Sequence, residues 1–239
     1  MTTALFRTDP TLGRCTARVT ALTPEGGIVL DQSVFYPTGG GQPGDAGLIR
    51  VDATEIAITT AVKGEGDDIV HLPAPDAPAI PIGTEVEVEI DAATRARYCR
   101  VHTCLHLLSV VIPLPVSGGS IAADKGRLDF DMPEAPEDKG AIEDALNTLI
   151  AADHAVTEDW ITDEELAANP GLVKTMSVKP PVGQGRVRLV RIGTGETQID
   201  LQPCGGTHVA STAAIGKVRI GKVEKKGKRN RRVYVHLID

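Results

Sequence analysis

The chain has 239 residues, of which 41% are hydrophobic and 24% charged, a composition that allows a packed core without covalent cross-links. Its four cysteines are too few, in a chain of this length, for the disulfide framework of a small secreted protein. The net charge is −7, and the aromatic content of 3% argues against nucleic-acid recognition based mainly on base stacking.

The N-terminus and the apolar stretches argue against secretion and membrane insertion. The first residues contain no basic segment followed by an apolar run, so we expect no signal peptide. The longest apolar stretch, residues 105–116, is interrupted by Ser109 and by two prolines and is too short to cross a membrane. We therefore expect a cytoplasmic protein with no membrane partner.

The first part of the chain has the pattern of a small β-barrel. Short runs with strand character are separated by Gly/Pro turns, and the last run alternates Glu with Val or Ile, which is typical of a strand with one buried face. The first two runs fit a hairpin closed by Thr-Pro-Glu-Gly-Gly. The expected strands are residues 16–22, 27–31, 47–62, 68–72 and 84–90.

A glycine-rich loop occupies residues 36–44 of this barrel. Its centre, Gly39, Gly40, Gly41 and Gln42, can present backbone N–H groups to a substrate oxyanion or a terminal phosphate. The same glycines also fit a simple tight turn, and both interpretations stay open.

The pattern changes at Asp91. Residues 92–111 lack Gly and Pro, have apolar positions at a helical period, and are followed by Pro113, so they predict a helix. Thr162 and Glu165 have the spacing of a helix-capping box. The remaining expected elements are a loop at 115–120, a strand at 127–132, a helix at 137–151, strands at 186–192 and 197–201, and a hairpin at 217–237. The predicted fold is α+β, with a β-barrel domain at residues 1–91 and an α+β domain at 92–239.

The C-terminal hairpin is strongly basic. Residues 217–232 contain nine basic residues and a single acid, Glu224, which fits the docking of a polyanion at one place on an otherwise acidic chain. A solvated hairpin surface is the alternative. The candidate polyanion contacts are Lys225, Lys226, Lys228, Arg229, Arg231 and Arg232.

Two distant segments carry residues that bind metals. His102 and His106 are four residues apart on the expected helix, so both imidazoles face the same side. Cys204 and His208 flank a Gly-Gly-Thr turn. Together they supply four donors of the types that zinc prefers. Cys99 shares the face of His102 and is an alternative ligand, whereas Cys104 faces away and is expected in the core. Four ligands make a closed, structural zinc site and three leave a position for water, and the sequence does not decide whether His208 binds the metal.

Several stretches, in this order and spacing, resemble the editing domain of alanyl-tRNA synthetase and of its freestanding relatives. They are Arg97 with His102-Thr-Cys-Leu-His-Leu-Leu108, Gly119-Ser120 leading to Gly126-Arg-Leu-Asp-Phe-Asp131, Cys204-Gly-Gly-Thr-His-Val209, Ile215-Gly216 and the basic run 225–233. The glycine-rich residues 36–44 and the strands before them resemble the extra N-terminal domain of the medium-length freestanding form. The editing domain of threonyl-tRNA synthetase is similar too. Cys104-Leu105 departs from the synthetase pattern, which more often has a small residue and Thr there.

The resemblance implies an editing fold of the threonyl/alanyl-tRNA synthetase type and a zinc ion at His102, His106, Cys204 and His208. It implies hydrolysis of seryl- or glycyl-tRNA(Ala), acting in trans at the acceptor end of tRNA(Ala). The candidate readers of a serine hydroxyl are Thr103, Ser117 and Ser120. Gly205 is the candidate hydrogen-bond donor to the oxyanion. An ordinary helix or turn role is the alternative for each. Two other functions stay open, a tRNA-binding module with a structural zinc and an unrelated zinc hydrolase.

Overall fold

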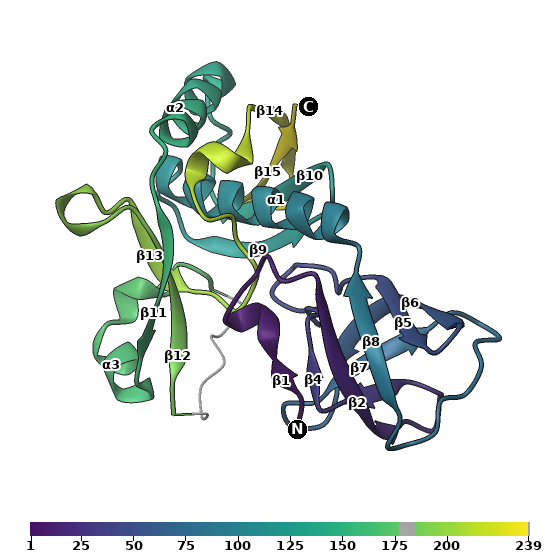
Figure 1. The fold of residues 1–239 in the computed structure, drawn as a ribbon. Helices are drawn as coiled ribbons and strands as arrows, with labels where there is room; N and C mark the ends of the chain where they lie inside the picture. The colour runs from purple at the N-terminus through teal and green to yellow at the C-terminus, as the bar shows by residue number, and fades with distance from the viewer. Residues whose placement is uncertain (177–184, 239) are drawn as a thin grey trace. The chain divides into compact units, whose positions relative to one another are not determined.

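The computed structural model describes residues 1–176 and 185–238 (Figure 1). The chain forms two compact units, Met1–Ala96 and Arg97–Asp239. The expected domain boundary between residues 91 and 92 coincides with the start of helix α1 (Ala92–Val111), whereas the units divide inside this helix. None of the described helices is both long and apolar enough to span a membrane.

Six strands of the N-terminal unit close into a barrel in the order β2-β3-β7-β6-β5-β8, with β8 pairing back to β2. Alternating side chains form the barrel interior: Val86, Val88 and Ile90 of β8 are buried inside the barrel, while Glu85 and Glu87 are exposed. The barrel strands are β2 (Arg14–Leu22), β3 (Ile28–Leu30), β5 (Gly47–Val51), β6 (Thr54–Lys63), β7 (Ile69–Pro73) and β8 (Glu85–Ile90). Two short strands, β1 (Thr3–Ala4) and β4 (Gln32–Ser33), pair outside the barrel, and a 3-10 turn η1 spans Leu5–Arg7.

The second unit contains a four-stranded antiparallel sheet in the order β14-β15-β10-β9. One face of α1, including Val101 and Leu105, packs on this sheet in a common core with Phe130 and Val233. The helix comes close because Gly126 has no side chain; a Cβ there would lie 2.6 Å from Cγ1 of Val101. The strands are β9 (Val116–Ile121), β10 (Lys125–Asp131), β14 (Val218–Lys225) and β15 (Asn230–Leu237).

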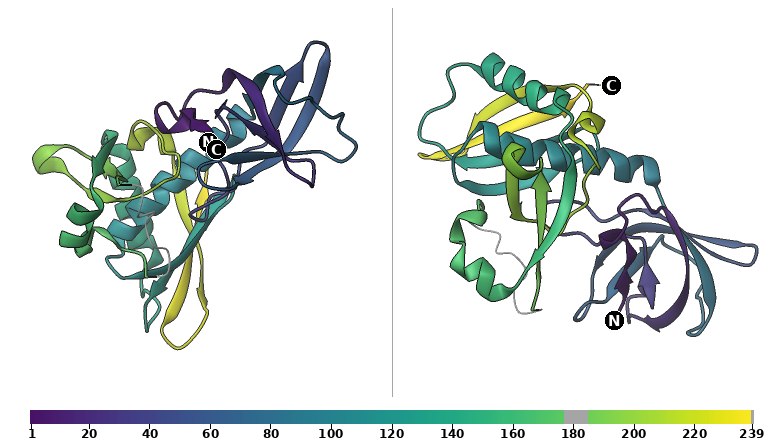
Figure 2. Two further views of the ribbon diagram at one scale, coloured as in Figure 1. Left: turned by 90° about the horizontal axis from the view of Figure 1, so that it is seen from below. Right: turned by 60° about the vertical axis from the view of Figure 1, so that its left-hand side comes forward.

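A three-stranded antiparallel sheet in the order β11-β12-β13 completes the second unit. Its strands are β11 (Val156–Ile161), β12 (Val187–Ile192) and β13 (Asp200–Pro203). The remaining elements are α2 (Lys139–Ala151), α3 (Asp163–Ala168) and the 3-10 turns η2 (Pro170–Leu172), η3 (Gly195–Thr197) and η4 (Thr212–Ile215). Figure 2 shows the β14–β15 hairpin from two further directions; in its left view the yellow tip extends away from the sheet.

Most expected elements are present at or near their predicted bounds. The predicted α+β class and barrel are confirmed, α1 has the bounds expected for it, and the Thr162–Glu165 capping box begins α3. Helix α2 begins after Asp138, whose carboxylate accepts from the N–H of Ala141 and so caps the helix two residues later than expected. The four cysteines, all in the described part of the chain, form no disulfide. Cys104 is fully buried in the core, as predicted.

Three expectations need correction. The expected strand at 47–62 is two antiparallel strands, β5 and β6, because the chain turns at Asp52, whose φ is 49°. Residues 115–120 were expected to form a loop, but Val116–Ile121 is strand β9, since β10 supplies its ladder of hydrogen bonds and Gly119 fits under Leu128. Strand β13 lies at Asp200–Pro203, later than the expected 197–201, because residues 195–197 form a 3-10 turn. Strand β11 was not predicted, because its side chains are mostly exposed and polar and give no alternation.

Candidate metal centre

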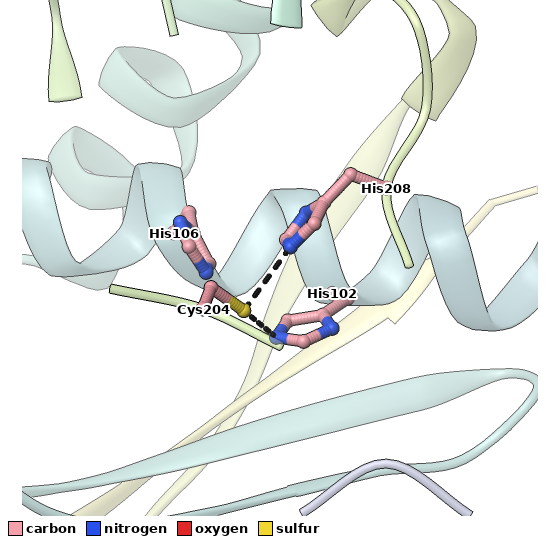
Figure 3. A group of neighbouring side chains, drawn as sticks. All are labelled: His102, His106, Cys204 and His208. Atoms are coloured by element: carbon pink, nitrogen blue, oxygen red, sulfur yellow. Dashed lines mark hydrogen bonds between the residues drawn. The ribbon is translucent and has the colours of Figure 1, made fainter. Parts of the chain in front are cut away.

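Helix α1 presents His102 and His106 from consecutive turns on one face. The two ring centroids are 5.3 Å apart, and each side chain is nearly buried, with 7% of its residue surface exposed. The opposite face of the helix packs on the four-stranded sheet, so core packing fixes the direction in which the two imidazoles point. The helix therefore delivers two nitrogen donors to one place (Figure 3).

Cys204 and His208 come from the loop that follows β13. The side chain of Arg188, on the neighbouring strand β12, holds this loop by donating Nη1–H bonds to the carbonyl oxygens of Cys204 (2.9 Å) and Gly206 (2.8 Å). Arg188 also forms an ion pair with Glu158 of β11. A buried arginine thus ties the ligand loop to the sheet.

The four side chains converge (Figure 3). Sγ of Cys204 lies 3.4 Å from Nε2 of His102 and 3.3 Å from Nε2 of His208, and one donor atom from each of the four residues lies within 4.8 Å of the others. Tetrahedral zinc, with bonds of about 2.0–2.3 Å, holds its ligand atoms about 3.3–3.6 Å apart. The cluster can hold a metal ion, and three imidazoles with one thiolate suit zinc.

The structure places His208 with the other three candidate ligands, whereas Cys99 stands outside this four-residue cluster. Cys99 is buried, and its Sγ lies 3.2 Å from the hydroxyl of Thr207. The pairing of segments about a hundred residues apart, which the sequence suggested from spacing alone, is therefore present in the fold.

Electrostatics favour the deprotonated form of two of the four donors, Cys204 and His208. Burial opposes ionisation of the Cys204 thiol, but the imidazoles of His102 and His208 outweigh it and hold the Cys204 pKa well below its usual value. Burial, helped by His102, lowers the pKa of His208 to about 3. Burial also acts to lower the pKa of His106, whereas hydrogen bonds to Asp200 and Cys204 raise it to about 9. A thiolate and a neutral His208 are the forms that coordinate a cation.

Thr103 supports the cluster from behind. Its hydroxyl donates to the carbonyl of Cys99 (3.0 Å), so it accepts from Nδ1–H of His208 (3.0 Å) and from N–H of Val209 (3.2 Å). This arrangement leaves Nε2 of His208 with its lone pair directed at the cluster. Thr103 is fully buried, so the geometry favours this supporting role over contact with a substrate hydroxyl.

The other pocket candidates lie in different settings. Gly205 is exposed beside Cys204, and a Cβ built on it would meet nothing within 4 Å, so a substrate has room to approach its backbone. Ser120 lies on β9 opposite Arg127 of β10. The hydroxyl of Ser117 donates to the carbonyl of Asp129 and accepts from Nδ2 of Asn230. The roles suggested for Ser117 and Ser120 remain predictions.

The glycine-rich loop of the N-terminal unit is a tight turn closed by reciprocal backbone hydrogen bonds between Gly39 and Gln42 (2.9 and 3.0 Å). Gly40 and Gly41 have φ values of 57° and 81°, which L-residues rarely adopt. Gln42 is buried, at 1% exposure. The residues therefore form the tight turn that the sequence allowed, and binding by these residues stays a prediction.

The basic hairpin divides into bound arginines and exposed lysines. Arg232 pairs with Asp129, Arg229 pairs with Asp131, and Arg231 is buried and donates to the carbonyl of Pro133. Asp129 and Asp131, two residues apart on β10, accept the hydrogen bonds of Arg232 and Arg229, respectively. The exposed cations near the tip are Lys222, Lys225, Lys226, Lys228 and Arg229, of which Lys226 pairs with Glu224 and Arg229 with Asp131.

Sequence reasoning missed Asp200, Gln202 and Arg188. Asp200 and Gln202 occupy alternate positions of β13 leading to Cys204, so their side chains share a face with the ligand. Polar residues at every second position before Cys204 were a usable signal. The local sequence gave no signal for Arg188, because its partners lie 16 and 18 residues further along the chain.

Comparisons with known proteins match the whole chain. Residues 187–234 match the family model described as the threonyl and alanyl tRNA synthetase second additional domain, and residues 12–94 match that of class II (A) tRNA synthetases. The alanyl-tRNA editing protein AlaX-M of Methanosarcina mazei is 33% identical over 250 residues, covering 100% of this chain and 98% of that protein. Its counterpart in Methanosarcina acetivorans is 32% identical over the full length of both. The alanine–tRNA ligase of Caldivirga maquilingensis is 33% identical over 207 residues, which make up 22% of the ligase.

Proposed function

Because this chain belongs to the alanyl-tRNA editing family, whose members are aminoacyl-tRNA deacylases, we propose that it hydrolyses seryl- or glycyl-tRNA(Ala) at a zinc ion. The proposed ligands are His102, His106, Cys204 and His208. The observation that supports this most strongly is the convergence of three imidazoles and a thiolate beside the exposed Gly205.

A second, hydrolytic site compensates for the limited selectivity of the synthetic site for alanine. A synthetic site for alanine cannot exclude glycine by size and rejects an added hydroxyl poorly, since one small group is worth only about 1–3 kcal/mol of discrimination. A separate pocket that binds the serine hydroxyl through a buried polar partner can discriminate by about 10⁴-fold. Ser117 and Ser120 are the proposed readers, and the buried Thr103 is proposed to orient His208 instead.

The reaction needs positioning and charge stabilisation more than a covalent nucleophile, because the scissile bond is an activated ester, and it needs no ATP. When bound, zinc supplies a positive charge that polarises an ester carbonyl or acidifies water. The chain's own contribution is a rigid donor set: α1 fixes two imidazoles by core packing, and Arg188 fixes the Cys204 loop. The backbone N–H of Gly205 is the proposed donor to the developing oxyanion.

The acceptor end of tRNA(Ala) is the proposed partner. The exposed lysines of the β14–β15 hairpin are proposed to contact its phosphates, a salt-sensitive and largely shape-based interaction. The predicted contacts of Gly39–Gln42 belong to the same proposal.

A tRNA-binding module with a structural zinc is the second candidate. The observation that favours it is the presence of four protein donors, since a site closed by four ligands is structural in most proteins. The full-length similarity to editing proteins weighs against the third possibility, an unrelated zinc hydrolase.

The test is deacylation by the purified chain of seryl-, glycyl- and alanyl-tRNA(Ala), followed by acid-precipitable counts. We expect rapid loss of the seryl or glycyl ester, sparing of the alanyl ester, and no loss with the His102→Ala variant. Zinc bound at one ion per chain with all three esters intact would establish the structural alternative.

A further inference from the structure

A buried carboxylate lies directly behind one of the candidate metal ligands. Asp200, at the start of β13, has a fully buried side chain, and its Oδ2 lies 3.2 Å from Nδ1 of His106. Nζ of Lys174 donates to the other oxygen, Oδ1, at 2.5 Å. An ionised carboxylate without solvent requires such partners, and Asp200 has an imidazole and an ammonium group.

The carboxylate of Asp200 determines which ring nitrogen of His106 carries the proton, because an ionised carboxylate only accepts, so Nδ1 must donate to Oδ2. Nε2 of Gln202 lies 2.6 Å from Oδ2 of Asp200 and 3.1 Å from Nδ1 of His106. The amide NH₂ of Gln202 is a donor and satisfies a second lone pair of Oδ2. Oδ2 therefore receives two donors, Gln202 Nε2–H and His106 Nδ1–H. With its proton on Nδ1, His106 keeps the lone pair of Nε2 on the side that faces Cys204 (Figure 3).

The strand makes this support rigid. Asp200 and Gln202 lie on one face of β13, and Cys204 follows two residues after Gln202. Asp200 is in register with Ile192 of β12, so the backbone that carries the carboxylate belongs to a paired strand and not to a loop. The same short segment thus carries a metal ligand and the group that orients another ligand from α1.

We propose that Asp200 is a positioning residue of the metal centre: it fixes the tautomer and the ring orientation of His106, and Gln202 and Lys174 hold its carboxylate in place. The proposal rests on the metal binding included in the proposed function, and not on the identity of the substrate. The competing interpretation is that Asp200 and Lys174 form a structural ion pair with no influence on the metal.

The first experiment measures zinc affinity of the full chain by competition with a chromophoric chelator. Asp200→Asn is expected to weaken zinc binding about 10- to 100-fold, the usual effect of removing such an outer partner. The matched control is Asp159→Asn, an acid-to-amide change in the same sheet whose carboxylate pairs with Arg191, away from the four ligands. This control is expected to keep wild-type zinc affinity.

A double-mutant cycle separates orientation of His106 from general damage to the fold. In the His106→Ala background, Asp200→Asn should have no further effect on zinc affinity, because the group that Asp200 orients is absent. An equal loss in both backgrounds, or wild-type affinity of Asp200→Asn, would overturn the proposal. Zinc affinity is read without tRNA, so a chain that never deacylates leaves this proposal standing while the proposed function fails.

The wild-type chain offers a second readout that needs no variant. Long-range ¹H–¹⁵N spectra of the zinc-loaded protein should show the His106 proton on Nδ1 and none on Nε2. A proton on Nε2 would contradict the proposal directly.

Discussion

Both units of this protein bury histidine, but the two environments differ in what the ring nitrogens face. In the barrel, His71 is fully buried, with Nε2 2.7 Å from the hydroxyl of Ser33 and Nδ1 2.9 Å from the carbonyl of Ile28. In the second unit, Nε2 of His102 and of His208 instead converge on one thiol sulfur. A histidine whose two nitrogens both have ordinary hydrogen-bond partners is satisfied within the fold, whereas nitrogens that converge on one sulfur can hold a cation.

Removal of the metal should produce the largest difference between the two units. With zinc 1,000-fold above its dissociation constant, binding contributes about 4 kcal/mol of stability. Chelation should therefore lower the free energy of opening of α1 and β13 by about that amount and abolish deacylation. Hydrogen exchange of peptides from each unit measures this. Equal loosening of the barrel strands β6 and β7 would contradict the assignment of the metal to the second unit.

Loss of a single ligand should come next in size. Cys204→Ala is expected to lower the deacylation rate at least about 100-fold and to reduce bound zinc, because loss of a ligand should cost no less than loss of its outer partner. His71→Gln is the matched change in the barrel and should retain the bound zinc, as elemental analysis will show. A Cys204→Ala enzyme with full activity would remove the thiolate from the mechanism.

The barrel histidine should respond to acid. Burial lowers the pKa of His71 to about 4. Below the ordinary histidine pKa the unfolded chain takes up a proton that the folded barrel refuses, so stability is present above pH 6.5 and is lost as the pH falls toward 4. Between pH 7 and pH 5 the free energy of unfolding should fall by about 2 kcal/mol.

Urea unfolding at several pH values, compared with His71→Gln, isolates this contribution. The variant is expected to be less stable throughout, but the difference in the free energy of unfolding between the two proteins should shrink as the pH falls. A constant difference would mean that His71 is protonated in the folded barrel.

The smallest effect is expected at the hairpin. Replacing the exposed Lys225 and Lys228 by Met should weaken tRNA binding about 10-fold and flatten its salt dependence, with zinc content unchanged. Filter binding across a salt series provides the measurement. Arg231 is unsuitable for this test, because it is buried and holds the carbonyl of Pro133, so reversing its charge would unfold the hairpin. Unaltered binding by the lysine variant would exclude the hairpin tip as a contact.

Local patterns in the sequence predicted most of the fold and the centre of the site. The helical period of residues 92–111 predicted the bounds of α1, and the spacing of its histidines predicted two members of the four-residue cluster. The sequence could not give partners that depend on tertiary contacts, such as Asp200 behind His106, 94 residues away. It also failed where the local signal was misleading, as in β9, whose glycines are accommodated by the neighbouring strand.

Gly126 gives the metal centre an unexpected dependence on the opposite side of α1. A methyl group at this strand position would meet Val101 at 2.6 Å, and Val101 is the residue next to His102. The distance between α1 and the sheet therefore determines whether the imidazoles of the helix reach the Cys204 loop. Hence one added carbon, on a residue outside the four-residue cluster, would misalign the four side chains while leaving every one of them in the sequence.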